Sequence, residues 1–342
     1  MKFAIVGAGV AGSFMASMLT QKDHEVQVFE LYRKEQHFPV CAWGASRHML
    51  SHFSQMAGLD FNDYILHVGE RIGIRLPNGK SDYLNCLGLV TYDKKRWEDD
   101  LLDGIPVNYG VRCTLENFPL HKYDYVLDCT GFHRSLLPRP KEKELIIPAW
   151  EYLVDNVYGA NEFYILGYKG ATGYFWFFPL KDNRAYVGAG DMNRIYLGVE
   201  EFFKENPTAK IVTKIGRPIR ITPPTRMEPL TNGNVIGVGE SIGCVFPLLG
   251  EGIIPSLICS ETLFDLFANK EYRHEEYRKR LLKKLGYYDE VYKVISLKME
   301  GKLSTIKHFK ILYKLYRNMK REEKRFGFEV NMEKLVNLLN AL

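Results

Sequence analysis

The chain has 342 residues, of which 46% are hydrophobic, 13% aromatic and 25% charged, with a formal net charge of +5. This length allows more than one globular core, and the mild positive charge without a basic reader motif argues against a nucleic-acid partner. The six cysteines form no C-x-x-C pair and no apolar run reaches 18 residues, so we expect a cytoplasmic protein with no metal, no signal peptide and no transmembrane helix.

The first 30 residues predict a strand, a turn, a helix and a second strand. A short buried strand at 3–6 precedes the pattern G-x-G-x-x-G, a helix follows from about 10 to 19, and a strand at 26–29 ends at Glu30. This order, with an acidic residue about 20 residues after the glycines, is typical of a dinucleotide site, whereas a glycine-rich turn without a ligand is the alternative.

Each glycine of this motif has a physical role. Gly7 permits the tight turn, Gly9 lets a pyrophosphate approach the backbone, and Gly12 allows the helix to pack closely on the strand. The helix N-terminus, where Ala11 lies, presents free N–H groups and the positive end of the helix dipole to phosphates. We expect Glu30 to accept hydrogen bonds from ribose hydroxyls.

Two local elements are predicted between residues 70 and 102. The stretch ERIGIRLPNGKSDYL predicts a β-hairpin that turns at Asn78-Gly79, a dipeptide favoured in two-residue turns. The stretch DKKRWEDDLL, residues 93–102, predicts a helix with Trp97 and Leu101 on one face.

Five consecutive aromatic residues lie in the stretch GYFWFFPLKDNRAYVGAG. Because side chains alternate between the faces of a strand, Tyr174, Trp176 and Phe178 are expected on one face. Phe175 and Phe177 are expected on the other face. One face would then pack on a core and the other would line a cavity, while a strand buried on both faces without a ligand is the alternative.

The strand after these aromatic residues contains two glycines. Residues 181–184 predict a turn, and the chain then returns through Gly188 and Gly190. Glycine inside a strand leaves room for a group that lies close to the backbone.

Two segments resemble FAD-contacting segments of the two-dinucleotide-type flavoproteins, the group that includes the aromatic hydroxylases. The stretch YDYVLDCTGFHR predicts a strand that ends in Cys129-Thr130-Gly131. In NVIGVGESIGCVFPLLGEGI, a strand is followed by Gly239-Glu240 and by a proline–glycine loop that leads into a helix. The resemblance implies that Glu240, where the family usually has aspartate, contacts the ribityl chain of FAD.

The same resemblance implies that the proline–glycine loop lies beside the isoalloxazine ring. The helix that begins near the end of this loop would stabilise negative charge on the reduced flavin. No second G-x-G-x-x-G is present, so the implied cofactor is FAD and a separate NAD(P) domain is not expected. The loop residues assigned to the flavin site are Pro247, Gly250, Gly252 and Ile253.

These segments together predict an α/β fold class. We expect an FAD-binding Rossmann-type (two-dinucleotide-type) domain with an inserted antiparallel β-sheet substrate domain and a helical C-terminal region. The expected ranges are 1–60, 92–140 and 231–268 for the FAD-binding domain, 61–91 and 141–230 for the substrate domain, and 269–342 for the helical region.

The aromatic strand resembles a motif of the geranylgeranyl reductase family, YxWxFP…GxG. The matching residues in this sequence are Tyr174, Trp176, Phe178, Pro179, Gly188 and Gly190, with eight residues between Pro179 and Gly188. The flavin segments resemble the same family in the same order, over about residues 1–265. The resemblance implies that these six residues bind a polyprenyl chain.

Two further residues are assigned to the flavin site by this resemblance. Cys41, in FPVCAWG, stands where many of these reductases carry a cysteine in a P-C-G turn, although Ala42 replaces the glycine here. Lys94 stands where relatives often have arginine. Cys41 is also a catalytic candidate that would gate the site or assist proton delivery, and a small buried turn residue is the alternative.

The implied reaction adds a hydride from reduced FAD to one alkene carbon and a proton to the other. Tyr174, a bound water and the reduced flavin are the candidate proton donors. The substrate would be an archaeal-type membrane lipid, a prenyl quinone or a prenyl diphosphate, and the reductant NAD(P)H or a ferredoxin. An FAD-dependent monooxygenase of an aromatic or lipid substrate and a flavin- or lipid-binding protein without turnover are the alternatives.

The C-terminal region is basic and amphipathic. Between residues 298 and 326, ten lysines and arginines are opposed by three glutamates, and residues such as Phe309 and Tyr313 recur at helical spacing. Such a helix either packs on its own domain with a solvated basic face or makes peripheral contact with an anionic membrane surface.

Overall fold

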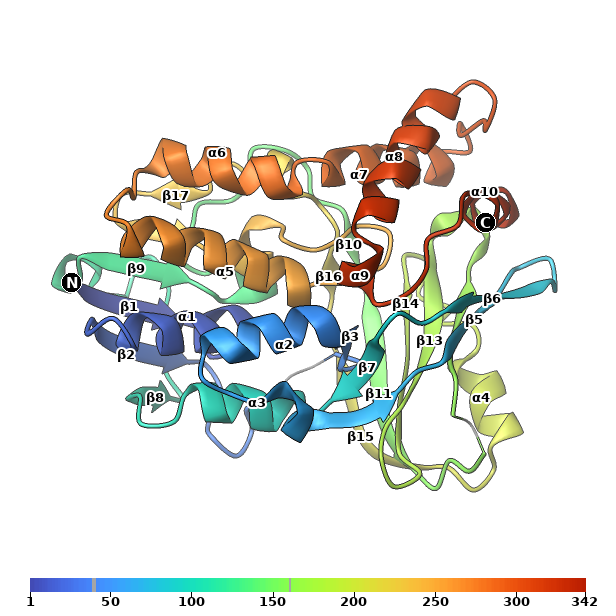
Figure 1. Cartoon of the computed structure of the whole chain (residues 1–342), viewed down its shortest axis with the longest axis horizontal. Coiled ribbons are helices and arrows are strands. Elements are labelled where there is room, and N and C mark those ends of the chain that lie inside the picture. Colours follow the sequence, from blue (N-terminus) through green and yellow to red (C-terminus); the bar gives the residue numbers. More distant parts are fainter. Residues whose placement is uncertain (39–40, 160) are drawn as a thin grey trace.

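The computed structural model describes residues 1–38, 41–159 and 161–342, which form two large β-sheets and a group of C-terminal helices (Figure 1). The first sheet has six strands in the order β17-β18-β9-β1-β2-β8. Neighbouring strands are parallel except β17 and β18. Its strands are β1 (Lys2–Val6), β2 (Glu25–Glu30), β8 (Val107–Tyr109), β9 (Tyr125–Asp128), β17 (Thr231–Asn232) and β18 (Val235–Gly237).

Helices cover this sheet because its strands are apolar on both faces. In β1, for example, Phe3 and Ile5 on one face and Ala4 on the other are completely buried. The ring of Phe3 meets the edge of Phe267 with their centroids 5.0 Å apart. The predicted α/β, Rossmann-type arrangement is confirmed. The helices of this part are α1 (Val10–Thr20), α2 (Arg47–Met56), α3 (Lys94–Leu101) and α5 (Ile253–Ala268).

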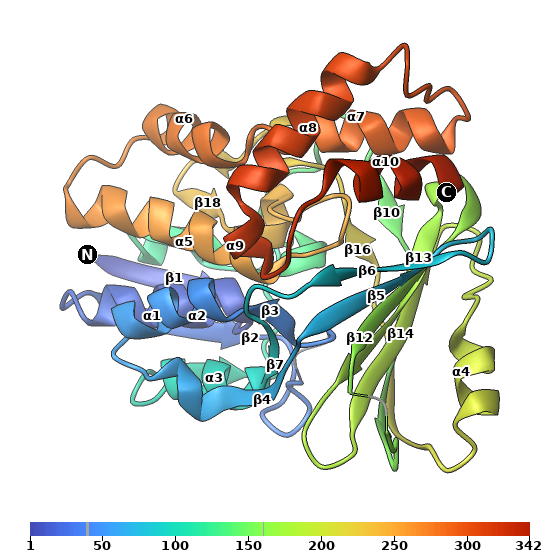
Figure 2. The ribbon, with the colours of Figure 1, turned by 45° about the vertical axis from the view of Figure 1, so that its right-hand side comes forward.

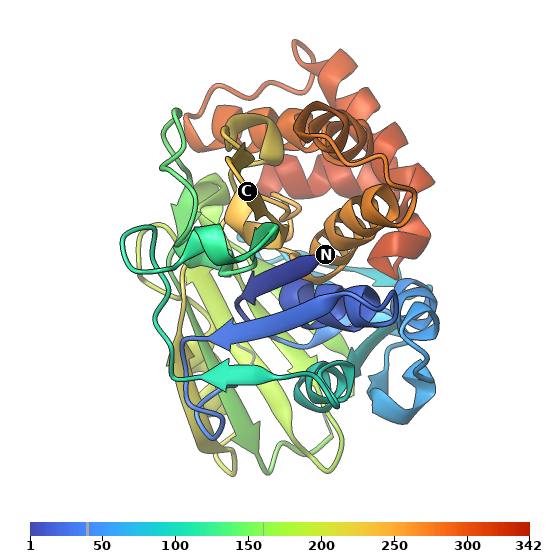
Figure 3. The ribbon, with the colours of Figure 1, turned by 90° about the vertical axis from the view of Figure 1, so that its left-hand side faces the viewer.

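The second sheet has seven strands in the order β15-β11-β14-β13-β12-β5-β6. Among the described residues of this sheet, β12 and β5 are parallel and the other neighbouring strands are antiparallel. The predicted hairpins at Asn78-Gly79 and at 181–184 are confirmed by the pairs β5–β6 and β13–β14. Figure 3 shows the first sheet in front of the second. The strands are β5 (Arg71–Arg75), β6 (Ser81–Asn85), β11 (Ala149–Asp155), β12 (Phe163–Gly167), β13 (Gly173–Pro179), β14 (Ala185–Asp191) and β15 (Lys210–Gly216).

One helix and two small sheets accompany the two large sheets. The helix α4 (Val199–Glu205) lies within a segment that the sequence predicted as strands. It forms there because Phe202 covers Phe175 and Phe177 on the outer face of the second sheet. The small strands are β3 (Gly44–Ser46), β4 (Ile65–Val68) and β7 (Leu89–Tyr92) in one sheet, and β10 (Ile146–Ile147) and β16 (Ile219–Arg220) in another.

The chain after residue 269 is helical, as predicted. Figure 2 shows the last helix, α10, next to β6 and β13 of the second sheet. Lys334 of α10 lies 3.3 Å from Asp82 of β6. None of the helices in the described part of the chain is long and apolar enough to cross a bilayer. The helices are α6 (His274–Leu285), α7 (Tyr288–Met299), α8 (Phe309–Arg321), α9 (Glu323–Phe326) and α10 (Met332–Ala341).

Candidate functional site

The glycine loop after β1 is shaped by steric contacts at two glycines and by an open space at the third. Gly7 has a φ of +102°, and a Cβ there would lie 2.3 Å from the Cys129 carbonyl oxygen. A Cβ at Gly12 would lie 1.9 Å from the Gly7 carbonyl oxygen. A Cβ at Gly9, the N-cap of α1, would meet nothing within 4 Å. The loop is therefore packed on the protein side and open only at Gly9, where a pyrophosphate would approach.

Glu30 at the end of β2 is held against this loop. Its carboxylate accepts backbone N–H bonds from Ala8 at 2.9 Å and from Tyr32 at 3.0 Å, and the side chain is buried. His37 lies 3.9 Å from the same carboxylate. The two backbone bonds fix the carboxylate at the cavity wall, and its remaining lone pairs are the acceptors that a ribose would use.

One continuous cavity of about 970 Å³ connects the glycine loop with the aromatic strand. Of the residues assigned from the sequence, Gly7, Gly9, Ala11, Glu30, Cys41, Lys94, Thr130, Gly131, Glu240, Pro247, Gly250, Gly252, Ile253, Tyr174, Trp176, Phe178 and Gly190 line it. Gly12, Gly239, Pro179 and Gly188 lie behind the lining. Pro39 and Val40 of the predicted P-C-G-like turn fall outside the described residues.

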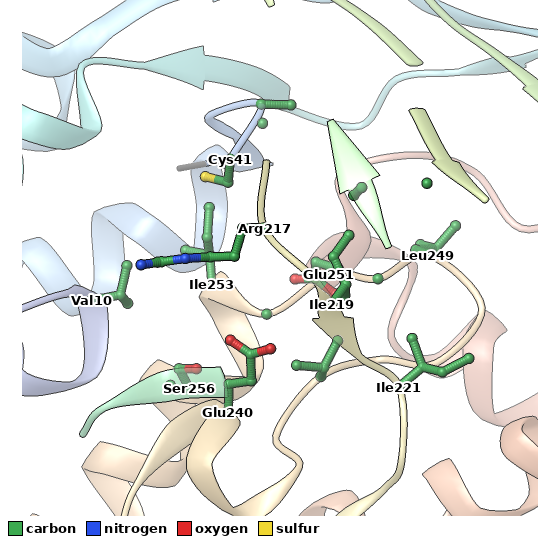
Figure 4. Close-up of a pocket in the computed structure, with 18 of the residues that line it drawn as sticks. Val10, Cys41, Arg217, Ile219, Ile221, Glu240, Leu249, Glu251, Ile253 and Ser256 are labelled. Carbon is green, nitrogen blue, oxygen red and sulfur yellow. The ribbon is translucent and has the colours of Figure 1, made fainter. Parts of the chain in front are cut away.

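Two arginines near the glycine loop line the cavity but were not predicted from the sequence. Arg112 and Arg217 both line the cavity. Figure 4 shows the Arg217 side chain extending between Cys41 and Glu240 toward Val10. Positive charge beside the glycine loop suits a phosphate-bearing ligand. Isolated arginines carry no local sequence signal, so only the fold reveals them.

Two partly buried glutamates anchor η6 (Gly239–Ile242) and the loop that connects it to α5. Glu240 accepts the Arg220 backbone N–H at 3.1 Å. Glu251 binds Arg325 of α9 with 2.7 Å between Oε2 and Nη1. Burial raises the pKa of both glutamates, and the arginines oppose this effect. The C-terminal helices thus hold the loop that was assigned to the flavin ring.

The aromatic strand β13 has the two faces that the alternation predicted. Tyr174, Trp176 and Phe178 line the cavity, whereas Phe175 and Phe177 belong to the core beneath α4. One face of the strand therefore packs on a core and the other borders the cavity.

The glycines of β14 make room for the Trp176 indole. Gly188 pairs with Trp176 on one side and with Glu151 of β11 on the other. A Cβ at Gly188 would lie 2.5 Å from the indole carbons. Across this gap, the Trp176 Nε1–H donates to the Glu151 carboxylate at 3.3 Å. The GxG half of the motif therefore allows a tryptophan to reach a carboxyl group two strands away.

Glu151 is a functional candidate that the sequence reasoning missed. It lines the cavity and is 6% exposed. Burial raises its pKa to about 8, although the Trp176 hydrogen bond and Lys94 oppose the rise. The sequence did contain a signal for this residue, because Glu151 lies at the same strand face as the buried apolar residues Ala149 and Leu153, where a carboxylate is unusual.

Tyr174 and Cys41 both keep their protons near neutral pH. The Tyr174 hydroxyl donates to the Leu249 carbonyl, and burial raises its pKa above the ordinary value. Burial raises the pKa of Cys41 to about 11, with Lys94 opposing the rise. Cys41 is therefore a thiol at the cavity wall, not a thiolate nucleophile.

Lys94 forms a buried ion pair within α3. Its Nζ lies 3.0 Å from Glu98, and both side chains are almost fully buried. Burial lowers the pKa of Lys94, but the interactions with Glu98 and Cys41 together raise it above the ordinary value. The positive charge is thus retained in the wall of the cavity, near Cys41 and Glu151.

The second arm of the cavity, called here the apolar arm, is lined mainly by aliphatic side chains, with Glu329, Asn331 and Lys334 also in its wall. It extends between the second sheet and α10, where a Cβ at Gly167 of β12 would lie 2.6 Å from the Leu342 side chain. Aliphatic side chains from both elements face this space. They are Ile72, Ile74, Leu84, Ile165, Leu335, Leu338 and Leu342.

Solved structures of flavoproteins share this fold. A geranylgeranyl bacteriochlorophyll reductase-like protein from Thermoplasma acidophilum aligns with a TM-score of 0.67 over 94% of this chain and 98% of that one, at 17% identity. A mutant of a flavin-dependent brominase aligns with a TM-score of 0.68 over 99% and 98%, at 11% identity. The chain has a flavoprotein fold. The likeness to the reductase-like protein agrees with the resemblance seen in the sequence.

The same fold also occurs with other chemistry. A probable FAD-dependent monooxygenase from Pseudomonas aeruginosa aligns with a TM-score of 0.62 over 88% of this chain and 99% of that one, at 14% identity. No family model and no curated protein matches the sequence. The reaction must therefore be argued from the residues of the cavity.

Proposed function

We propose that the protein is an FAD-dependent reductase that hydrogenates double bonds of an isoprenoid chain. The observation that supports this best is the continuity of the cavity, because one space joins the open glycine loop, the aromatic strand and the apolar arm beneath α10. Its volume of about 970 Å³ is at the upper end of the roughly 300–1,000 Å³ of small-molecule sites.

We assign FAD to the arm of the cavity that contains the glycine loop. The open position at Gly9, the fixed carboxylate of Glu30 and the arginines Arg112 and Arg217 fit the pyrophosphate and ribose of a dinucleotide. In this proposal the FAD-binding domain comprises 1–60, 92–140 and 231–268, and the substrate domain comprises 61–91 and 141–230.

The apolar arm is the proposed site of the isoprenoid chain. Such a chain presents only methyl groups and alkenes, so it gains free energy from burial alone, at roughly 25 cal/mol per Å² of apolar surface. Trp176 and Phe178 stand where this arm meets the glycine-loop side, and Leu338 and Leu342 close it on the α10 side. The arm thus suits a long apolar chain better than a compact polar substrate.

When bound, reduced FAD supplies a hydride to one carbon of an alkene. We assign the matching proton to Glu151. Its O–H bond breaks as a C–H bond forms on the second carbon, and the carboxylate that remains is stabilised by the Trp176 N–H and by Lys94. A general acid works best with a pKa near the working pH. This favours Glu151 over Tyr174, whose O–H already donates a hydrogen bond to the Leu249 carbonyl.

The direct test is anaerobic. The flavin-loaded protein is reduced with dithionite, freed of excess reductant, and mixed with geranylgeranyl diphosphate or a geranylgeranylated glycerolipid. Flavin reoxidation, with a product heavier by two hydrogens per turnover, is the expected result. A flavin that stays reduced with both substrates, but reoxidises rapidly in air when NADPH is supplied, would replace this proposal with a monooxygenase.

A matched pair of variants tests the assignment of the apolar arm. Leu338→Trp fills the arm, whereas Asn337→Trp adds the same side chain on the exposed side of α10. Only the first is expected to slow reduction of the long chain, while both should bind FAD. NAD(P)H and a reduced ferredoxin, tried in turn in place of dithionite, then identify the class of reductant.

A further inference from the structure

The first turn of α8 and the residues before it expose an apolar surface. Ile306, Phe309 and Tyr313, called here the α8 patch, are 89%, 57% and 47% exposed. Ile306 has the highest exposure of any large hydrophobic residue in the described part of the chain. The rings of Phe309 and Tyr313 stack with centroids 6.1 Å apart. The other face of α8 is packed, since Leu312, Leu315 and Met319 are buried.

Basic side chains surround the α8 patch. Residues 298–317 contain six lysines and arginines but one glutamate, Glu300. Glu300 pairs with Lys302 at 2.8 Å, and Lys314 pairs with Glu290 of α7. Within the described residues, Lys307, Lys310 and Arg317 form no ion pair. An exposed aromatic and aliphatic surface with unpaired cations beside it is typical of a helix that lies in a lipid interface.

The α8 patch is separated from the candidate substrate arm by one helix. A groove between α8 and α10 is lined by Ile306, Phe309, Leu312, Met332 and Val336. A neighbouring face of α10 presents Leu335 and Leu338 to the main cavity, which Leu342 also lines. Figure 2 shows α10 lying between α8 and the second sheet. A surface that touches the α8 patch therefore also touches the helix that closes the apolar arm.

We propose that the α8 patch docks the protein on an anionic lipid bilayer, with α10 at the bilayer surface. The proposal rests on the proposed function insofar as an isoprenoid lipid in that bilayer would enter the cavity on this side. Lysines and arginines near an anionic surface are attracted to it, and the apolar side chains add the free energy of their burial. The charge surplus favours this occupant over a neutral apolar partner.

The test is vesicle co-sedimentation of the FAD-loaded full chain. Vesicles of phosphatidylcholine alone are compared with vesicles that contain one quarter phosphatidylglycerol, at low and at high salt. We expect binding to the anionic vesicles that weakens with salt and that falls by about tenfold or more in the double variant Ile306→Ser/Phe309→Ser. The control Ile195→Ser/Leu197→Ser alters two apolar residues before α4 that are 64% and 55% exposed, and should bind as the wild type does.

Three outcomes would overturn the docking proposal. Equal binding of the wild type and the α8 variant, equal binding to both kinds of vesicle, or self-association that the α8 variant abolishes would each remove the bilayer as occupant. Reduction of soluble geranylgeranyl diphosphate is measured in parallel. If that reaction occurs without vesicle binding, the docking proposal fails alone, and if vesicles bind but neither substrate is reduced, the proposed function fails alone.

Discussion

The buried carboxyl of Glu151 gives the sharpest prediction, because its protonation affects both stability and the proposed reaction. Its pKa is about 8 in the folded protein, against an ordinary value of 4.5. When folding raises the pKa of an acid, the folded state loses stability as the pH rises from the pKa of the unfolded state to the pKa of the folded state. The difference, at 1.36 kcal/mol per pH unit, corresponds to about 5 kcal/mol once both states are ionised.

The substitution Glu151→Gln removes this ionisation and keeps the shape of the side chain. Between pH 5 and pH 9, the wild type should lose on the order of 4 kcal/mol more unfolding free energy than Glu151→Gln, because all other titrating groups cancel in the comparison. Denaturant unfolding at several pH values measures this. The control Glu200→Gln, at an exposed position of α4, should follow the wild type.

The same variant tests the role in catalysis. Anaerobic single-turnover reduction by the wild type should slow above pH 8 as Glu151 loses its proton, and Glu151→Gln should be slower by roughly 10²-fold or more without that limb. Glu151→Asp should recover part of the rate. If Glu151→Gln has the rate and the pH profile of the wild type, Glu151 is not the proton donor. If its unfolding free energy depends on pH as that of the wild type does, the carboxyl of Glu151 is not neutral in the folded protein.

Three further predictions concern the walls of the cavity. Gly9→Val should fold normally, since an added Cβ meets nothing within 4 Å, but should weaken FAD binding by about tenfold or more, about 1.4 kcal/mol, as measured by fluorescence titration. Tyr174→Phe loses the hydrogen bond to the Leu249 carbonyl, which should lower the unfolding free energy by about 1 kcal/mol. The reduction rate should fall by much less than the ~10²-fold expected when a general acid is removed. A larger fall would indicate that Tyr174 is the proton donor. Arg325→Met leaves Glu251 buried without its cation and should cost roughly 3–5 kcal/mol in denaturant unfolding, and a loss below 1 kcal/mol would show that the pair does not hold the loop.

Much of the fold and part of the site could be predicted because their causes are local. Gly12 is required by a contact within one strand–turn–helix unit, and Gly7 is required by its positive φ in the turn, which the G-x-G-x-x-G spacing predicts directly. The alternation of Tyr174, Trp176 and Phe178 with their neighbours follows from the period of a strand. Helix α4 was missed because its packing on Phe175 and Phe177 depends on residues that are distant in the sequence.

The C-terminal region was likewise predicted only in part. Its helical spacing and basic charge were visible in the sequence, but the sequence left open whether the apolar residues of α8 pack inward. The structure divides them, because Leu312 and Met319 are buried while Ile306 and Phe309 remain exposed. A helix has two faces, and only its neighbours decide which residues of an apolar stripe they cover.

The sequence by itself determined the local units, namely the glycine loop at Gly7–Gly12 and the two-faced aromatic strand, since each depends on residues within a few positions of one another. Only the tertiary structure decided what these units face. Glu151 meets Trp176 because β11, β14 and β13 are adjacent in this register and Gly188 leaves a gap between them. The apolar arm exists because α10 returns to the second sheet from the far end of the chain, a contact set by packing and register that no local spacing records.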